Sequence, residues 1–351
     1  MYIFITVDPD SIDNIRTPLF RQGAETLFRL ITKQNGILAV DKDNNIIKKL
    51  KRSIPTLSPS CNNIKIMLEE ILKDNKKLVK ISVDNTDTLT GQICQIFRKL
   101  PRASVIIIHE NSIEDYRDEY IDEEPLEYFN TINDYKCQFM NRARKFRDKG
   151  VQLDFKTSDQ FFYDVISRSS IFTKKISFYD YLIGNDKIPE KQLNNWTLGL
   201  KHIINYWIYC SYYIKDKKLV TNDKIKIGLI TKATKPKQNK ETGEWDDFNK
   251  ADKHFDTLVR VILLPLKKEF GKYCEFELIM KNDRYNDFKG RFMKTDQGFM
   301  EWRKGFDLFK TSRDGNNVFT RNHVHWISQA DRFNDISMID QLEDYKHQNI
   351  Q

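Results

Sequence analysis

The first half of the chain alternates short apolar runs with amphipathic stretches, and this alternation limits the folds open to it. Residues 2–7 (YIFITV) are β-branched and aromatic and predict a strand, whereas residues 19–34 place Leu27, Leu30 and Ile31 on one helical face. Alternating strands and helices form a parallel sheet, because parallel pairing needs a long crossover connection. Further strands are predicted at 37–40, 78–83 and 103–108, and further helices at 62–73 and 89–99. The first half is therefore predicted to be an α/β domain with a parallel sheet.

The length of the chain favours a second domain. Its 351 residues exceed the size at which one core usually stops growing. We place the boundary near residue 155, which gives an α/β domain over 1–155 and a second α/β domain over 156–351. Strands of the second domain are predicted at 176–179, 224–231, 275–280 and 323–327, with a strand pair inside 291–309, and helices at 196–213, 248–270 and 336–347.

Two further structural features are each predicted from one property of the sequence. Residues 125–149 are predicted to be helical, because they hold many charges and no glycine, and 151–155 to be a strand. Pro265 is expected to kink the helix over 248–270, since proline cannot donate the hydrogen bond of the helix interior.

Composition narrows the class of protein. Apolar runs such as 103–108 and 259–266 are too short to cross a bilayer, and the N-terminus lacks the layout of a secretory signal. The five cysteines form no CxxC pair and no grouping with histidine at metal-ligand spacing, so we expect them to be reduced and partly buried. These features predict a cytoplasmic protein.

The net charge of +8 favours an anionic partner. Nucleic acid is the first candidate and a membrane surface the second. The charge is uneven, since 113–127 is acidic and 231–240 holds four lysines. A lysine-rich loop is, in the alternative, an ordinary solvated surface.

An acidic residue follows each of four predicted strands. In a parallel sheet these positions meet at the carboxyl edge, where sites form. Four converging carboxylates would hold Mg²⁺ or Mn²⁺, hard cations that prefer oxygen ligands, and such a centre can hydrolyse phosphodiesters. Asp10, Asp13 and Asp87 are reserve ligands, and His109 is a candidate general acid. The four residues are Asp8, Asp41, Asp84 and Glu110, of which Asp8, Asp84 and Glu110 are the candidate catalytic group.

The arrangement is similar, in fold and spacing alone, to that of PIN-type metal-dependent nucleases. The alternative is structural. Aspartate is favoured after strands because it starts turns and caps the next helix, and Asp41 and Asp84 lie in sequences of that kind.

The segment 291–309 (RFMKTDQGFMEWRKGFDLF) predicts a strand, a turn at Gln297-Gly298, a second strand and a Gly-Phe-Asp corner. With 176–184 (ISFYDYLIG), it resembles the phospholipase-D-like C-terminal domain of proteins that contain a microtubule-interacting-and-trafficking domain. Bacterial proteins of conflict loci contain similar domains. The resemblance spans roughly 159–346, and its specific part is short.

The chain departs from this family at several motif positions. Tyr179-Asp180-Tyr181 stands where bacterial relatives tend to have Asp-Pro-Tyr, and Lys289-Gly290-Arg291 where the family tends to have His-Asp-Arg. The corner Gly305-Phe306-Asp307 keeps the family's Gly-x-Asp. No histidine has a lysine two residues on, so the His-x-Lys motif of phospholipase-D chemistry is absent and the domain is expected to be inactive.

Five cations on the strand pair are candidates for binding phosphates of nucleic acid or of a lipid headgroup. The alternative is that they pair with the interleaved acidic residues Asp287, Asp296, Glu301 and Asp307. The five are Lys289, Arg291, Lys294, Arg303 and Lys304.

Two aromatic or histidine-rich segments favour structural roles. The helix over 196–213 has the spacing of a buried face, and a base-stacking platform needs interleaved cations, whereas this helix has only Lys201. His323 and His325 share a strand face, but no third metal ligand is near them in sequence. The common nucleotide-binding and hydrolase motifs are absent.

These observations predict a prokaryotic antiviral defence protein. Its first domain would be a Mg²⁺- or Mn²⁺-dependent nuclease, and its second a nucleic-acid-binding or oligomerising module. The chief alternative is a non-enzymatic binding and assembly subunit for partner proteins and nucleic acid. A peripheral membrane protein is the third hypothesis, since the eukaryotic family is associated with membranes and partner recruitment.

Overall fold

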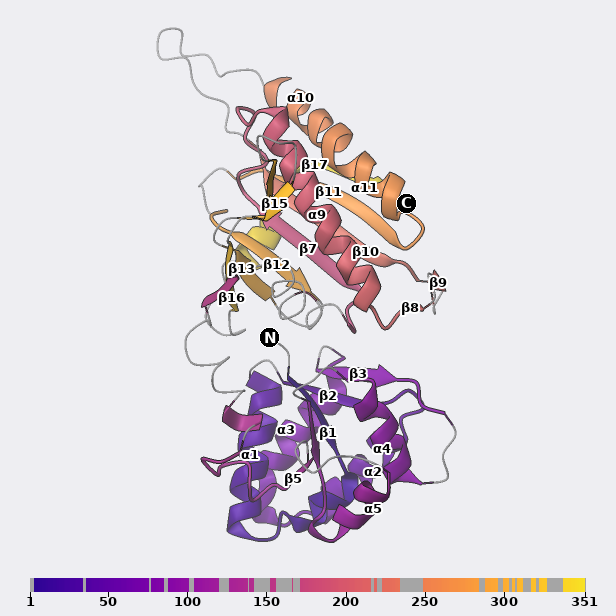
Figure 1. The fold of residues 1–351 in the computed structure, drawn as a ribbon. Helices are drawn as coiled ribbons and strands as arrows, with labels where there is room; N and C mark the ends of the chain where they lie inside the picture. The colour runs from indigo at the N-terminus through magenta and orange to yellow at the C-terminus, as the bar shows by residue number, and fades with distance from the viewer. Residues whose placement is uncertain are drawn as a thin grey trace. The chain divides into compact units, whose positions relative to one another are not determined.

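The computed structural model divides the chain into two compact units, Met1–Lys149 and Gly150–Gln351. Each unit has its own sheet and its own buried core, so both are α/β domains, as the sequence predicts (Figure 1). The structure describes residues 3–33, 36–75, 77–84, 88–100, 104–119, 126–137, 139–141, 152–155, 166, 171–215, 218–219, 223–233, 249–283, 288–295, 299–302, 305–306, 308–311, 317–319, 322–326 and 337–350.

The sheet of the first unit is parallel throughout, in the order β3-β2-β1-β4-β5. The central strand β1 is buried along its whole length, which explains its continuous apolar sequence. The strands are β1 (Ile3–Val7), β2 (Gly36–Asp41), β3 (Leu78–Ile81), β4 (Val105–Ile107) and β5 (Leu126–Glu127). The parallel sheet predicted for this half is confirmed.

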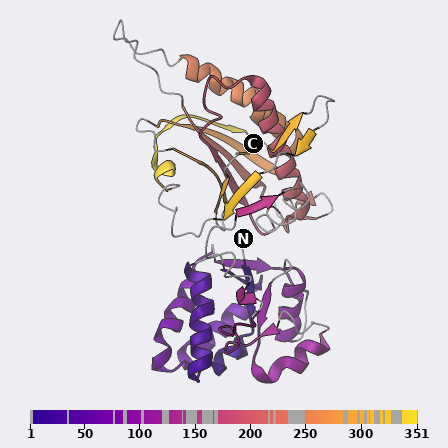
Figure 2. The ribbon, with the colours of Figure 1, turned by 60° about the vertical axis from the view of Figure 1, so that its left-hand side comes forward.

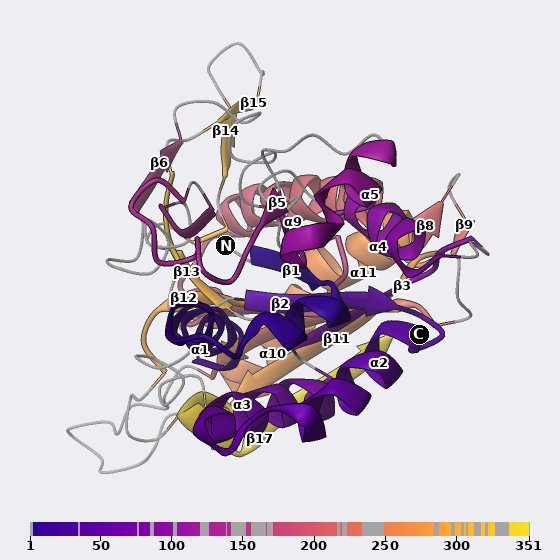
Figure 3. The ribbon, with the colours of Figure 1, turned by 90° about the horizontal axis from the view of Figure 1, so that it is seen from below.

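Helices cover both faces of this sheet. Figure 3 shows α1, α2 and α3 on one side and α4 and α5 on the other, as right-handed crossovers in this strand order require. Leu27, Phe28 and Ile31 of α1 are fully buried, so the predicted apolar face of that helix is confirmed. The helices are α1 (Pro18–Lys33), α2 (Asn45–Ser53), α3 (Asn62–Lys73), α4 (Leu89–Arg98) and α5 (Ile113–Asp118), with 3-10 turns η1 (Pro9–Asn14), η2 (Ile54–Thr56), η3 (Pro59–Cys61) and η4 (Glu110–Ser112).

The sheet of the second unit is mixed, in the order β17-β11-β10-β7-β12-β13-β16-β6. β7, β10 and β11 are parallel, and the remaining strands pair antiparallel with their neighbours. Because β6 belongs to this sheet, the units divide a few residues before the predicted boundary at 155. The strands are β6 (Gln152–Phe155), β7 (Lys175–Asp180), β10 (Ile225–Lys232), β11 (Cys274–Lys281), β12 (Arg291–Thr295), β13 (Phe299–Trp302), β16 (Asn322–Trp326) and β17 (Asp344–Ile350).

Three helical segments lie together on one side of this sheet (Figure 2). They are α9 (Glu190–Cys210), α10 (Asn249–Leu258) and α11 (Leu264–Phe270). α9 buries Trp196, Leu200 and Trp207, so the core role predicted for this helix is confirmed for that face.

A π-helical turn, η6 (Val259–Leu263), joins α10 to α11 and relieves the interruption that Pro265 imposes. A proline at 265 cannot donate to the carbonyl of Val261. That carbonyl instead accepts a hydrogen bond from the Thr197 hydroxyl at 3.1 Å, which ties α9 to the irregular turn. At the position of the predicted kink the helical run therefore continues through a π-helical turn, and a neighbouring helix satisfies the backbone carbonyl that Pro265 leaves without its donor.

Two predicted helices are wrong in part. Leu126–Glu127 forms strand β5 within the stretch predicted to be helical, because these residues pair with β4. The C-terminal segment is helical only near 337–341, and Asp344–Ile350 is strand β17, paired antiparallel with β11. Two short hairpins were not predicted, β8 (Ile214–Lys215) with β9 (Lys218–Leu219) and β14 (Phe309–Thr311) with β15 (Asn317–Phe319).

All five cysteines are free, and Cys210 alone among them is more than marginally accessible. Burial raises the pKa of the Cys94 and Cys274 thiols to about 12, which keeps them protonated. Among the helices that the structure describes, none has both the length and the apolar character needed to cross a membrane.

Candidate functional site

The four carboxylates predicted to converge follow four parallel strands and so lie toward one edge of the first sheet. Asp8 follows β1, Asp41 ends β2, Asp84 lies beyond β3, and Glu110 lies beyond β4. The strand order reverses between β1 and β4, which is where open α/β sheets commonly bind ligands. The four residues follow strands at the same edge of the sheet, as predicted, but their side chains differ in burial and in hydrogen-bond partners.

Asp41 caps helix α2. Its Oδ2 accepts a hydrogen bond from the amide of Asn45 at 2.7 Å, and its Oδ1 accepts one from the amide of Ile46 at 2.8 Å. The side chain is fully buried. Both oxygens therefore satisfy amides at the helix N-terminus, which is the structural alternative for this residue.

Asp8 is buried at the start of the turn η1. Its Oδ1 accepts from the Asp10 amide at 3.0 Å, and its Oδ2 accepts from the Tyr116 hydroxyl of α5 at 2.9 Å. Burial raises the pKa of the Asp8 carboxyl, and these two hydrogen bonds oppose the rise. The carboxylate joins β1 to α5 across the edge of the sheet.

Asp84 and Glu110 are exposed. The Asp84 amide donates to Gln95 Oε1 at 2.7 Å, and the amide of Asn111 donates to His109 Nδ1 at 3.1 Å, so His109 caps the turn η4. Asp10 and Asp13 are also exposed, and Asp87 lies outside the described residues. Within the described part of the chain, no three His, Cys, Asp or Glu side chains are grouped as a metal site requires.

A fifth carboxylate at this edge, Glu127 at the end of β5, was not predicted. It accepts hydrogen bonds from the Thr131 hydroxyl at 2.6 Å and from the Cys137 thiol at 3.2 Å. Little in the sequence indicates this strand end, because β5 is very short and follows an acidic run within the stretch predicted to be helical.

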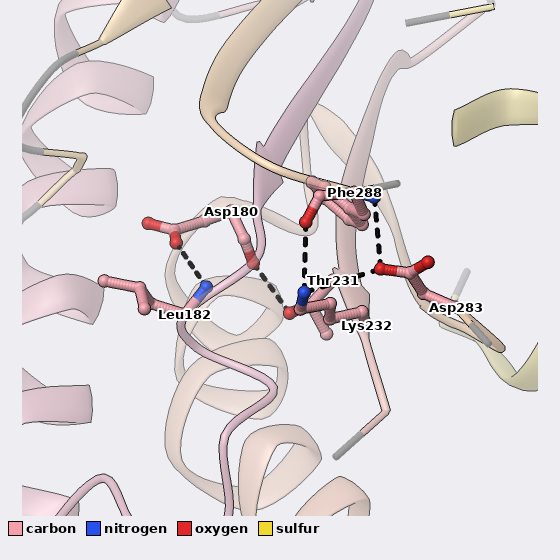
Figure 4. A network of polar contacts seen from close by, with 6 residues as sticks. All are labelled: Asp180, Leu182, Thr231, Lys232, Asp283 and Phe288. Carbon is pink, nitrogen blue, oxygen red and sulfur yellow. Dashed lines mark hydrogen bonds and ion pairs between the residues drawn. The ribbon is translucent and has the colours of Figure 1, made fainter. Parts of the chain in front are cut away.

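In the second unit, Asp180 at the end of β7 is buried and makes contacts in several directions. Its Oδ1 accepts from the Leu182 amide at 2.9 Å, and its Oδ2 accepts from Trp196 Nε1 at 3.0 Å. Its backbone carbonyl accepts from the Thr231 hydroxyl at 2.6 Å, which ties β7 to β10 (Figure 4).

Arg291, at the start of β12, forms an ion pair with this carboxylate, with 3.6 Å between Nε and Oδ1. Burial raises the pKa of the Asp180 carboxyl to about 6, although the Arg291 guanidinium acts to lower it. Asp180 is buried and hydrogen-bonded to Leu182 and Trp196, and its ion pair with Arg291 links β7 to β12.

Gly305 completes the cluster. Its φ is +73°, and a Cβ at this position would lie 2.7 Å from Arg291 Cδ and 2.9 Å from Asp180 Oδ2. The next residue, Phe306, packs against Trp196 with ring centroids 5.4 Å apart. Asp180 comes from segment 176–184, and Arg291 and Gly305 come from segment 291–309, so residues of the two segments lie in one place. Asp307 is outside the described residues.

A pocket of about 60 Å³ opens beside the pair, lined by Asp180, Arg291, Trp196, Gln192 and neighbouring apolar side chains. The carboxylate and the guanidinium on the wall of this pocket are already paired with each other. We therefore interpret the cluster as a structural contact between strands.

A second polar group lies on the neighbouring strand ends. Lys232 Nζ contacts Asp283 Oδ2 at 3.4 Å and donates to the Phe288 carbonyl at 3.1 Å, while the Phe288 amide donates to the same carboxylate oxygen at 3.1 Å (Figure 4). Asp283 is fully buried, so Lys232 and an amide together compensate its charge. This network holds the segment before β12 against β10.

The predicted phosphate-binding cations are not a single exposed set. Arg291 is paired with Asp180, and Lys294 Nζ lies 2.5 Å from Asp340 Oδ2. Neither of these partners was among the acidic residues considered from the sequence. Lys289 is exposed, and Arg303 and Lys304 lie outside the described residues.

Comparison of the chain with protein-family models, with curated proteins and with solved structures finds no match.

Proposed function

We propose that the chain is a non-enzymatic nucleic-acid-binding and assembly protein. Its resemblance to domains from bacterial conflict loci supports a role in antiviral defence. The basic excess lies mainly in the second unit, where residues 150–351 contain 34 Lys and Arg against 28 Asp and Glu, or +6 of the total +8. Such an excess favours association with a polyanion.

The observation on which this proposal depends is the use of the strand-end carboxylates. Asp41 satisfies two amides of α2 with both of its oxygens, and Asp8 is bonded to Asp10 and Tyr116. A carboxylate committed to backbone amides in a buried site is a poor ligand for Mg²⁺ or Mn²⁺. The described residues at this edge therefore do not fit a metal centre.

The Mg²⁺- or Mn²⁺-dependent nuclease is the second candidate. One observation favours it: Asp8 and Glu110 follow β1 and β4, which are neighbours where the strand order reverses. For Asp8 to bind a metal ion through Oδ2, Tyr116 would have to release that oxygen.

The two candidates are separated by cleavage and by thermal stability. Wild-type chain is incubated with single-stranded DNA and RNA in Mn²⁺ or EDTA, and its melting temperature is measured under both conditions. We expect no cleavage and no rise in melting temperature with Mn²⁺, because a native metal site would stabilise the fold by binding.

Mn²⁺-dependent cleavage by the wild type that is lost in Asp8→Asn with Glu110→Gln would overturn the non-enzymatic proposal. Glu70→Gln serves as the matched control, since Glu70 is an exposed carboxylate on α3 and is not a candidate ligand. Its cleavage should equal that of the wild type whichever candidate is correct.

A further inference from the structure

The C-terminal end of α9 presents several tyrosines, which we call the tyrosine surface: Tyr206, Tyr209, Tyr212 and Tyr213. Tyr209 is 83% exposed, the most exposed of the large hydrophobic side chains among the described residues. Its ring centroid lies 6.1 Å from that of Tyr206, and Tyr212 and Tyr213 are 5.7 Å apart. Tyr206 and Tyr209 do not belong to the buried face of α9 that contains Trp207, and Tyr212 and Tyr213 follow the helix.

The backbone and a buried ring hold this surface in place. The Tyr212 amide donates to the carbonyl of Ile171 at 2.7 Å, and the Tyr213 hydroxyl donates to that of Phe172 at 3.4 Å. The ring of buried Phe172 packs against Tyr212 at 5.3 Å. Aromatic rings fixed in advance lose little conformational freedom on binding a flat partner.

Lysines from two other segments accompany these tyrosines. Lys174 Nζ lies 4.9 Å from the centroid of Tyr213. Lys215 faces Lys218 across the β8–β9 hairpin, which follows α9 and the two last tyrosines along the chain (Figure 1). The contact with Lys174 could not be predicted from the sequence, because the predicted helix over 196–213 contains only Lys201.

Lys174 also pairs with Asp223 at 3.5 Å. Lys215 and Lys218 are exposed and are register partners in the hairpin. Facing like charges destabilise a pair of strands, so an anion that lies between them would stabilise the hairpin. The lysines of this surface are Lys174, Lys215 and Lys218.

We propose that the tyrosine surface and these lysines bind single-stranded nucleic acid. Unpaired bases can stack on tyrosine rings while lysines neutralise the backbone, whereas the bases of a duplex are already stacked with one another. A lipid surface fits less well, because the exposed aliphatic side chains of the described residues, such as Leu19, Ile66 and Leu264, lie on other elements. This inference deepens the proposed function and rests on it.

The test is fluorescence anisotropy of the full chain with labelled oligothymidylate in EDTA. Tyr209→Ala should weaken binding roughly 5- to 100-fold, the effect of losing one stacked base, and Tyr209→Phe should restore it. Tyr135→Ala is the matched control, because Tyr135 is 76% exposed and has Lys136 5.6 Å from its ring, but lies in the first unit. It should bind as the wild type does.

Charge reversal tests the lysines separately. Lys215→Glu with Lys218→Glu should reduce the slope of log affinity against log salt by about 1.4, for two lost contacts to single strands. Lys187→Glu with Lys253→Glu, at exposed positions on other segments, makes the same charge change as a control.

The outcomes are distinct. If the wild type binds neither oligothymidylate nor RNA, the proposed function itself fails. If it binds them but Tyr209→Ala binds equally well, or if a duplex binds as tightly and with the same dependence on Tyr209, only this inference is overturned. Tyr209-dependent binding to phosphatidylserine vesicles without oligonucleotide binding would assign the surface to lipid instead.

Discussion

Replacing Arg291 by methionine tests whether the Asp180–Arg291 pair pins β12 to β7. The change keeps much of the apolar stem but removes the charge that faces Asp180, whose side chain is 2% exposed. Removing one partner of a buried pair typically costs about 3–5 kcal/mol, because the other charge is left uncompensated. Asp180 can limit that cost by taking up a proton.

Protonation makes the effect depend on pH. The folded-state pKa of Asp180, about 6, lies above its ordinary value of 3.8, so the folded chain binds the extra proton between these values. Wild-type stability from this group is therefore greatest at low pH and falls as pH rises through about 6. Without Arg291 the pKa of Asp180 rises further, so the variant continues to lose unfolding free energy above pH 6. Between pH 5 and pH 7.5 it loses up to about 2 kcal/mol more than the wild type does, at about 1.4 kcal/mol per pH unit.

Urea unfolding at the two pH values measures this difference, with tyrosine and tryptophan fluorescence as the signal. Lys289→Met is the matched control, since Lys289 is exposed on the same segment and should change stability by less than about 0.5 kcal/mol. A loss for Arg291→Met below about 1 kcal/mol and equal at both pH values would show that the pair does not hold the strands together.

Two further substitutions test individual contacts. Asp41→Ala should lower the unfolding free energy by about 2 kcal/mol, since two amides of α2 lose their acceptor. Asp43→Ala, at an exposed position in the neighbouring turn, is the control and should change the unfolding free energy little. Equal urea midpoints for the two variants would contradict the capping role of Asp41. Gly305→Ala should lower the melting temperature through a loss of at least about 1 kcal/mol, because φ is +73° and the new methyl group would meet Arg291 and Asp180. A melting temperature equal to that of the wild type would mean that the corner does not pack as described.

The elements with strong local signals were predicted well from the sequence. α3 spans the predicted residues, β1 and β4 lie inside the apolar runs that indicated them, and β2 extends its predicted run by one residue at each end. β17 was missed because its sequence, DYKHQNI, has no alternation of apolar and polar residues; its strand form comes from pairing with β11. Tertiary pairing here overrides local preference.

The candidate sites were harder to predict than the helices and strands, because they depend on contacts between segments that are distant in the sequence. Strand ends predicted that Asp8 and Asp41 would share an edge, but not that Tyr116 and the amides of α2 would occupy their oxygens. The ion pair between Asp180 and Arg291 joins segments more than a hundred residues apart, so the spacing of residues in the sequence could not predict it. Lys174 likewise reaches the ring of Tyr213 only in the folded domain.

The positions of β6 and β17 bear on how the second unit can be joined to other chains. These two strands, the first and last of the unit, lie at opposite edges of the sheet with six strands between them. At about 4.8 Å per strand spacing, the edges lie roughly 30 Å apart. Many domains have adjacent termini, which permits their insertion into a loop or their circular permutation. Closing this unit on itself would need a linker of about ten extended residues, so its architecture suits connection in series and resists insertion.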